Sequence, residues 1–186
     1  MPYQGQKWVD PQTGDIAEML ATSKETNGEK VVFKMIVKPG GFKPAQHIHV
    51  KQDESFEIIS GKLTYLINGK KKTAAAGEKI VLPKGIGHTH YNDEPEGDLV
   101  VIQSISPALD CEIFLENLFG LTNDGKIKGG EPKFLQIMAW SNHYQSETWL
   151  AKLPLSLQRF IAFVSFPVAK LLGYKAVYKK YSGYNA

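Results

Sequence analysis

The chain has 186 residues, of which 42% are hydrophobic and 22% charged, a composition ordinary for a soluble globular protein with one sizeable core. Its single cysteine, Cys111, excludes an internal disulfide and a cysteine-based zinc site. The net charge of +3 is uneven, because residues 148–186 carry six basic and no acidic side chains, which leaves −3 for the remainder.

The first fifteen residues, MPYQGQKWVDPQTGD, are polar and lack the basic stretch and apolar run of a secretory signal. The chain also has no apolar run of the about twenty residues that a bilayer span needs. We therefore expect a cytoplasmic protein. Because the sequence shows no nucleic-acid motif and no basic patch near its paired histidines, we expect no nucleic-acid partner.

Turn residues divide the first part of the chain into short segments. Residues 16–22 fit either a strand or a short helix. Asn27-Gly28 favours a type I′ hairpin turn. In residues 31–38, which follow it, apolar residues alternate with lysines at 34 and 38, a pattern typical of a half-buried strand.

The segment 41–61, GFKPAQHIHVKQDESFEIISG, contains the first chemically notable cluster. Alternate side chains of a strand point to one face, so His47 and His49 are expected to project together. A turn after them would bring Glu54 beside them on the next strand. Two imidazoles and a carboxylate make most of a transition-metal site, and the alternative is a surface strand with two solvated histidines.

Short apolar segments separated by turn residues continue to residue 105, with Asn68-Gly69 as a second hairpin turn. The expected strands are 56–60, 62–67, 70–75, 79–82, 89–92 and 99–105. Many short strands at this spacing predict an antiparallel barrel or sandwich.

The segment 77–92, GEKIVLPKGIGHTHYN, supplies a third histidine, His88, after a Pro and Gly turn. Together with 41–61 it resembles the two signature motifs of the cupin family. The first motif is filled by Gly41, His47, His49, Glu54 and Gly61, and the second by Gly77, Pro83, Gly85, His88 and Asn92. The resemblance covers about residues 31–107 and implies a mainly β fold, the double-stranded β-helix of the jelly-roll (cupin barrel) type.

After Pro107 the pattern changes. Residues 111–117 fit a last strand or a short helix, and helical spacing begins near Phe134 and again after Pro154. Pro167 predicts either a kinked helix or two short ones. We therefore expect a cupin barrel over 1–117, with its core motifs in 41–92, and a C-terminal helical extension over 118–186.

The extension is expected to pack on the barrel or on a dimer partner, and we predict a homodimer. The alternative follows from its six basic side chains, which are Lys152, Arg159, Lys170, Lys175, Lys179 and Lys180. With no acidic residue among them, the tail could rest on a membrane surface or on an acidic partner. His143, isolated in this region, is expected to be structural.

The resemblance implies that His47, His49, Glu54 and His88 meet in the mouth of the barrel and bind one divalent transition metal. Such a donor set suits Fe, Mn, Co, Ni, Cu or Zn, and disfavours Mg or Ca, which prefer oxygen ligands. Spacing does not choose among the six. Four protein ligands would leave positions open for substrate or dioxygen.

Further residues near these ligands are candidates for catalysis. His90 should share the inward face of His88 and could act as a general base or a hydrogen-bonding group, or be a packed histidine at the rim. We predict His90 and Glu54 as catalytic. Glu57 lies three residues past Glu54 and is expected to face outward.

The predicted substrate-binding residues are Phe56, Ile58 and Tyr65. Phe56 and Ile58 follow Glu54 on the inward face of their strand and would line an apolar cavity. The side chain of Tyr65 could face either way.

The resemblance implies a metal-dependent enzyme acting on a small organic molecule, with a dioxygenase-like oxidoreductase as the first hypothesis. A metal-dependent isomerase or lyase of a sugar or keto compound is the second, and a non-catalytic binding protein the third. Phosphosugar enzymes need basic clamps, whereas the only arginine, Arg159, lies in the tail.

Overall fold

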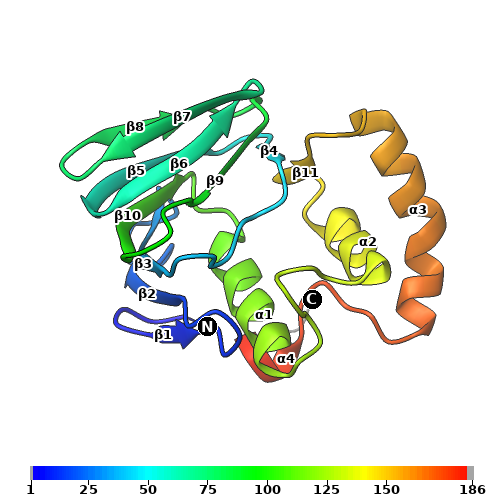
Figure 1. Cartoon of the computed structure of the whole chain (residues 1–186). Helices are drawn as coiled ribbons and strands as arrows, with labels where there is room; N and C mark the ends of the chain where they lie inside the picture. The colour runs from blue at the N-terminus through cyan, green and yellow to red at the C-terminus, as the bar shows by residue number, and fades with distance from the viewer. Residues whose placement is uncertain (1, 184–186) are drawn as a thin grey trace.

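The computed structural model describes residues 2–183 and shows two antiparallel β-sheets with helices along one side (Figure 1). The six-stranded sheet contains, in spatial order, β1 (Lys7–Val9), β2 (Ile16–Ala21), β3 (Val31–Val37), β10 (Leu99–Ser106), β5 (Asp53–Ser60) and β8 (Lys79–Leu82). The five-stranded sheet contains β11 (Thr148–Leu150), β4 (His47–His49), β9 (His88–Asn92), β6 (Lys62–Ile67) and β7 (Lys70–Ala75).

The helices are α1 (Cys111–Asn123), α2 (Phe134–His143), α3 (Leu155–Leu171) and the short α4 (Lys179–Ser182). Residues 16–22 are thus mainly strand and 111–117 are helix, which settles two alternatives that the sequence left open. Pro167 lies inside α3, which is assigned as one helix and not as two. Across residues 2–183, none of the helices combines the length and the apolar character needed to cross a bilayer.

The two Asn-Gly pairs have different surroundings. Asn68 and Gly69 both have positive φ and join β6 directly to β7, as a type I′ hairpin turn requires. Asn27 and Gly28 also have positive φ, but they lie in a longer loop between β2 and β3. The prediction of a hairpin turn at Asn27 was therefore right about backbone conformation and wrong about the length of the connection.

The hydrophobic core lies between the sheets. It is formed by the buried side chains of Val37, Phe56, Ile58, Leu63, Ala74, Leu82, Leu99 and Val101. At its other end the six-stranded sheet is covered by α1, where Leu115 packs against both Phe33 and Met19. Met35 contacts the clusters on both sides and joins the barrel core to α1.

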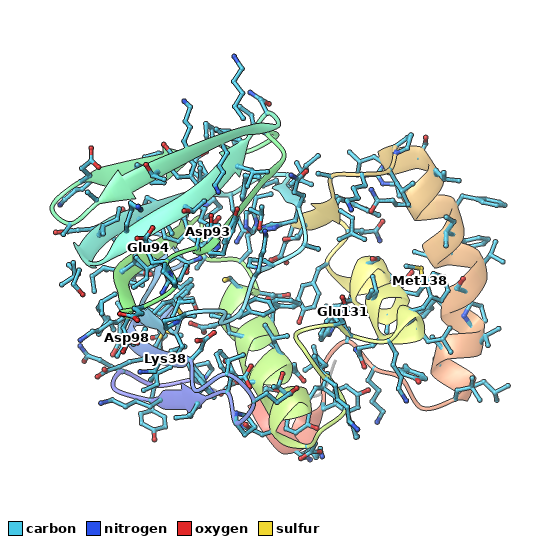
Figure 2. The ribbon with its side chains drawn as sticks, in the orientation of Figure 1. Lys38, Asp93, Glu94, Asp98, Glu131 and Met138 are labelled. Atoms are coloured by element: carbon cyan, nitrogen blue, oxygen red, sulfur yellow. The ribbon has the colours of Figure 1, made fainter. Side chains whose placement is uncertain are left out.

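The region after α1 is joined to the rest of the protein in two ways. Its helix α2 and the residues before α4 pack on α1 in a second core around Leu121, Trp140 and Val177, and Met138 is buried on the side of α2 that faces α3 (Figure 2). Its strand β11 pairs with β4 and so becomes the edge of the five-stranded sheet. The boundary predicted after residue 117 falls inside α1, and the division into two units stays a prediction.

The predicted fold class is confirmed. The chain is mainly β, a double-stranded β-helix built from two antiparallel sheets, followed by a helical extension.

Candidate metal centre

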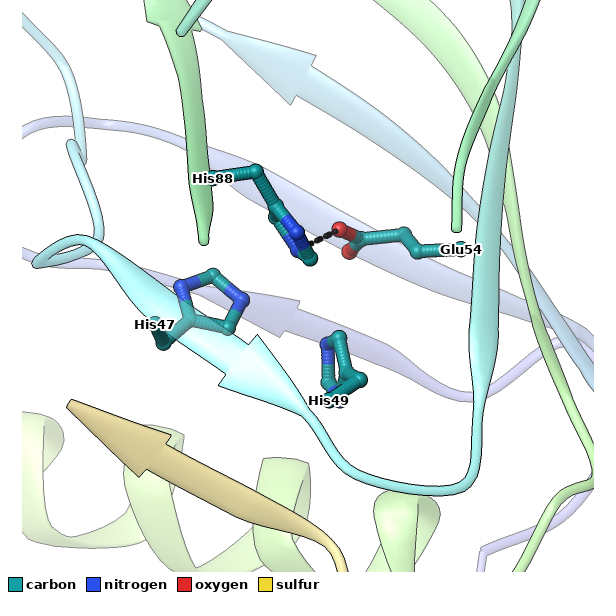
Figure 3. Close-up of side chains that lie close together, drawn as sticks. All are labelled: His47, His49, Glu54 and His88. Atoms are coloured by element: carbon teal, nitrogen blue, oxygen red, sulfur yellow. Dashed lines mark ion pairs between the residues drawn. The ribbon is translucent and has the colours of Figure 1, made fainter. Parts of the chain in front are cut away.

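Four side chains from three strands converge between the sheets (Figure 3). His47 and His49 come from β4, Glu54 from the start of β5 and His88 from the start of β9. One nitrogen or oxygen atom of each lies within 4.8 Å of those of the other three. His47 is directly opposite His88 in the β4–β9 ladder, so both side chains share the inward face. The expected convergence of these four residues is what the structure shows.

Two glycines of the segment 41–61 have steric reasons to be glycine. A Cβ atom on Gly41 would clash with the carboxylate of Asp15, which accepts hydrogen bonds from the backbone N–H groups of Lys38 (2.7 Å) and Phe42 (2.6 Å). Gly61 has a φ of +80° and lies against the backbone oxygen of Asp98. These two glycines hold the chain at the two ends of segment 41–61, which carries three of the four clustered side chains.

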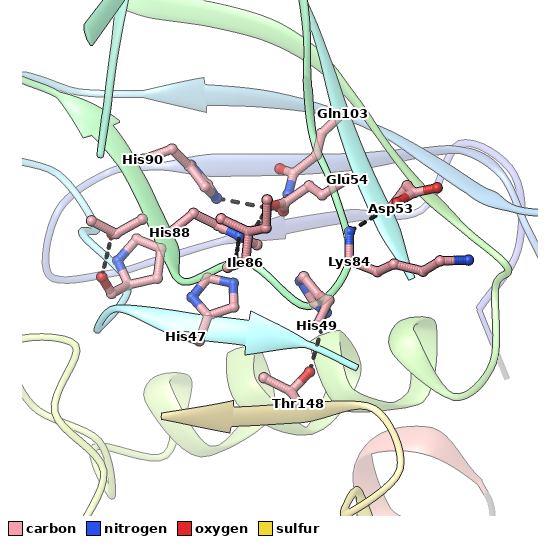
Figure 4. Close-up of polar contacts among 12 residues, drawn as sticks. His47, His49, Asp53, Glu54, Lys84, Ile86, His88, His90, Gln103 and Thr148 are labelled. Atoms are coloured by element: carbon pink, nitrogen blue, oxygen red, sulfur yellow. Dashed lines mark hydrogen bonds and ion pairs between the residues drawn. The ribbon is translucent and has the colours of Figure 1, made fainter. Parts of the chain in front are cut away.

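Hydrogen bonds set the orientation of the imidazoles. Nδ1 of His47 lies 2.9 Å from the carbonyl oxygen of Ala45, and Nδ1 of His88 lies 2.8 Å from that of Ile86. Because a carbonyl oxygen only accepts, both Nδ1 atoms carry the proton and both Nε2 atoms keep a lone pair. Nδ1 of His49 contacts the hydroxyl of Thr148 at 3.2 Å (Figure 4). All three rings can therefore present Nε2 to a common centre.

Glu54 is 2% exposed and held from two sides. Its Oε1 accepts a hydrogen bond from Nε2 of Gln103 and lies 3.6 Å from Nε2 of His90 (Figure 4). Its Oε2 lies 3.1 Å from Nε2 of His88. Among residues 2–183, Oε2 of Glu54 and Nε2 of His88 are two of the few buried polar side-chain atoms that have no hydrogen-bond partner. Two unsatisfied polar atoms facing each other indicate that a further species belongs beside them.

The site favours a carboxylate beside neutral imidazoles. Burial raises the pKa of Glu54, but the electrostatic effect of the neighbouring histidines, that of His90 first, outweighs burial and holds this pKa well below its usual range. Burial lowers the pKa of His47 to about 3 against an opposing effect of Glu54. Burial also lowers the pKa of His49, again against Glu54. An ionised carboxylate and unprotonated imidazoles are the forms that bind metal ions.

The residues fit a transition metal. Three imidazole nitrogens and one carboxylate oxygen are the ligands of Zn, Fe, Mn, Ni, Co and Cu sites, with bonds of about 2.0–2.2 Å for zinc. Ligand atoms within 4.8 Å of one another are compatible with a single ion between them. The cluster could therefore hold one transition metal, whose identity these four ligands leave undetermined.

The other predicted site residues, His90, Phe56, Tyr65 and Ile58, lie on the inward face or in the barrel core. His90 is inward, with its side chain 16% exposed and its ring 4.6 Å from that of Phe56. Tyr65 is opposite His90 in the β6–β9 ladder, so it shares the inward face and is partly buried against the barrel core. Ile58 lies deep in that core. Roles of these four residues in catalysis or substrate binding stay predictions.

Two residues outside the predicted site have clear structural roles. Glu57 faces away from the cluster and forms an ion pair with Lys79 at 2.9 Å. His143 lies in α2, where its ring packs on Tyr144, and its Nε2 is 3.9 Å from a carboxylate oxygen of Asp110.

Sequence reasoning missed two polar residues that touch the cluster. Gln103 lies on the inward face of β10 between Val101 and Ile105, and a polar side chain at an inward position was a signal that could have identified it. Thr148 belongs to β11, which lies about a hundred residues further along the chain than His49. No local pattern marks Thr148, because its role depends on a strand pairing at long range.

Comparisons with known proteins agree with the fold. A family model described as a cupin domain matches residues 33–105. An oxidoreductase of Arthrobotrys oligospora is 25% identical over 158 residues, which is 78% of this chain and 62% of that protein. The "Probable oxidoreductase virH" of Hypocrea virens is 28% identical over 187 residues, which is 91% of this chain and 84% of that protein. Epoxidase atD of Aspergillus terreus is 24% identical over 161 residues, which is 78% of this chain and 48% of that protein.

Solved structures similar to this chain include KdgF from Halomonas sp., with 21% identity, a TM-score of 0.48, and 56% of this chain and 89% of that chain covered. A protein of Klebsiella pneumoniae subsp. pneumoniae with a double-stranded β-helix domain has 24% identity and a TM-score of 0.45, with 55% and 85% covered. The family match, the two filled motifs and the two-sheet barrel together show that residues 33–105 form a cupin domain, which a helical extension follows.

Proposed function

We propose that this protein is a metal-dependent oxidoreductase, dioxygenase-like in its use of O₂, that acts on a small organic molecule. The observation that carries the proposal is the pair of unsatisfied buried atoms, Oε2 of Glu54 and Nε2 of His88, at the point where His47 and His49 also converge. Oxidative chemistry is favoured over isomerisation because two relatives are named oxidoreductases and a third an epoxidase.

His47, His49, Glu54 and His88 would hold the transition metal, which would supply a Lewis acid and, where it is redox-active, electron transfer to O₂. The protein supplies the arrangement around it. Carbonyl oxygens of Ala45 and Ile86 hold two imidazoles with Nε2 inward, and Gln103 holds the carboxylate of Glu54. A site held this way needs little rearrangement when its ligands bind.

In this proposal His90 takes the proton of the substrate. Its Nε2 lies 3.6 Å from Oε1 of Glu54, so a proton received by the ring is stabilised by a buried negative charge. Its ring packs on Phe56, which limits its movement. His90→Gln keeps a polar side chain but removes the base, so we expect kcat to fall by about 10²–10⁴-fold while metal content is unchanged.

The proposed substrate is uncharged or weakly anionic and largely apolar. The only arginine, Arg159, lies on α3, 5.7 Å over the ring of Trp149, and is not one of the residues at the metal cluster. The ring of Phe56 packs on that of His90, and Tyr65 lies opposite His90 in the β6–β9 ladder, so aromatic rings border the proposed base. A phosphorylated substrate would require basic groups at the site.

The test is metal analysis of protein purified without oxygen, followed by O₂ uptake against a panel of phenols and diketones. We expect a redox-active metal at one equivalent and uptake with at least one compound. Zinc or manganese without uptake, but with isomerisation of a carbonyl compound, would contradict the oxidative proposal. Stoichiometric metal with no turnover of either kind would contradict any catalytic role.

Two further properties are part of the proposal. We propose a cytoplasmic location, and a homodimer that forms through the outer faces of the barrel sheets, where Ile59 and Val81 are exposed large apolar residues. Light scattering at micromolar concentration is expected to give twice the mass of the chain. A monomeric mass would contradict the dimer and would not bear on the proposed metal site.

A further inference from the structure

Helix α3 turns its large apolar side chains away from the protein. Phe163 is 76% exposed and Leu171 is 86% exposed, and other bulky apolar residues of the helix are exposed with them. The remainder of this outer face consists of Leu157, Phe160, Val164 and Val168. From Leu157 to Leu171 these positions recur at intervals of three and four residues, so they form one continuous stripe on the helix.

The opposite side of α3 is the one that packs on the protein. Its buried residues are Gln158, Ala162 and Ala169, which are polar or small, and this side of the helix faces α2 (Figure 1). Side chains on the outer side extend into the surroundings (Figure 2). A helix that buries small residues and exposes phenylalanines and leucines is not explained by the packing of this chain alone. Exposed apolar patches of this kind mark sites of interaction.

The charged side chains of α3 and of the segments directly before and after it are all positive. Arg159 and Lys170 lie on α3 itself, Lys152 precedes it and Lys175 follows it, and all four are exposed. Residues 148–186 contain no aspartate or glutamate. An apolar helical face bordered by basic side chains is the pattern of a helix that lies in the interface of an anionic bilayer.

A second copy of this chain fits the stripe less well. In a two-fold dimer a surface meets itself, so the basic side chains around α3 would face those of the other copy with no acidic side chain from 148–186 between them. An anionic lipid surface attracts the same charges. Charge complementarity therefore favours lipid over self-association through α3.

A hollow at the C-terminal end of α3 adds positive charge at the same place. It has a volume of about 630 Å³ and is bordered by Leu172 and Tyr174. Lys126, Lys128 and Lys133 also border it, with Glu131 as the acidic residue among its lining. These three lysines add positive charge beside the C-terminal end of the apolar stripe, which favours an anionic surface there.

We propose that α3 binds in the plane of an anionic membrane surface, with the stripe from Leu157 to Leu171 in the acyl region and the surrounding basic side chains on lipid phosphates. The barrel then lies on the side of α2 and α3 away from the membrane, as Figure 1 shows its position relative to α3.

The test uses the full chain and phosphatidylcholine vesicles with or without phosphatidylglycerol, in flotation experiments at low and high salt. We expect flotation with the anionic vesicles, loss of most of it at high salt and little with phosphatidylcholine alone. Arg159→Gln with Lys170→Gln should weaken partitioning by about fivefold per charge. The matched control, Lys70→Gln with Lys72→Gln, removes two exposed lysines from β7 and should leave partitioning unchanged.

A combined variant, Phe160→Ser with Phe163→Ser and Leu171→Ser, should reduce partitioning by about 10-fold or more, since it removes three large apolar groups. Circular dichroism and thermal unfolding check that it folds. Should it fail to fold, Phe163→Cys with a polarity-sensitive fluorophore replaces it, because native Cys111 is buried. The emission should shift to the blue on anionic vesicles, and the same label on Lys72→Cys should not shift.

Three outcomes would overturn the proposal. One is the absence of flotation with anionic vesicles, and another is equal binding to neutral and anionic vesicles. The third is a dimer that the combined variant converts to a monomer while neither protein floats, which would show that a second copy covers α3.

Discussion

The hydroxyl oxygen of Thr148 lies 3.2 Å from Nδ1 of His49, and the two residues are directly opposite each other in the β11–β4 ladder. Thr148 belongs to the segment after the barrel, whereas His49 belongs to the metal cluster. The extension therefore contributes a group that helps to orient one of the three imidazoles. Partners of this kind fix the ring so that its other nitrogen faces the metal.

Thr148→Val removes this hydrogen bond and keeps the shape of the side chain. We expect it to lower metal affinity by about 10–100-fold, measured by competition with a chelator. Thr148→Ser should restore most of the affinity, and Ser146→Ala, at an exposed neighbouring position, should have no effect. Equal affinities of the valine and serine variants would show that the hydroxyl plays no part.

Gln103 holds Glu54 by donating a hydrogen bond to its Oε1. Gln103→Leu leaves that buried oxygen without its donor, so we expect unfolding free energy to fall by about 1–3 kcal/mol. The same loss should raise the pKa of Glu54, because the hydrogen bond favours the ionised form. Metal affinity should then decline more steeply on acidification than in the wild type. Ser104→Ala, on the outward face of β10, is the control.

Glu54 and Glu57 lie on the same strand but face opposite ways. If Glu54 is a metal ligand, adding Zn²⁺ or Mn²⁺ to the metal-free protein should raise Tm, because ligands that bind the native state stabilise it. Glu54→Gln should abolish most of that rise. Glu57→Gln removes a surface carboxylate that is paired with Lys79. This variant should keep the full rise in Tm on addition of metal. A rise that persists in Glu54→Gln would exclude this carboxylate as a ligand.

Glu147 is buried next to Asp110, and burial together with the negative charge of Asp110 raises its pKa to about 7. A carboxyl whose pKa is raised in the folded state stabilises the protein fully below its unfolded pKa of 4.5, and this contribution is lost as pH rises through 7. Glu147→Gln cannot titrate. Relative to this variant, the wild type should lose on the order of 3 kcal/mol of unfolding free energy between about pH 5 and about pH 8.

Chemical denaturation of both proteins at the two pH values measures this difference, and titrations elsewhere in the chain cancel in the comparison. Parallel pH dependences in the two proteins would show that Glu147 titrates normally.

The placement of His47 and His49 on one face, with Glu54 on the next strand, was predictable from local rules, whereas their convergence with His88 was implied by the resemblance to the cupin motifs. Alternation along a strand puts residues 47 and 49 on one face, and the strand β8 was predicted with its observed bounds, 79–82. The hairpin at Asn68-Gly69 was predictable for the same reason, since only certain residues adopt positive φ in a two-residue turn. In each case the information lies within a few residues of the feature.

The sequence by itself thus determined the barrel, its strands and the side chains that meet at its centre. Only the tertiary structure decided that 111–117 are helical, because α1 is held by packing on Phe33 and Met19 from distant strands. The tertiary structure alone also shows that Thr148 lies beside His49 and that the apolar stripe of α3 is exposed. Contacts between residues far apart in the chain depend on how the elements pack, and local periodicity carries no information about that packing.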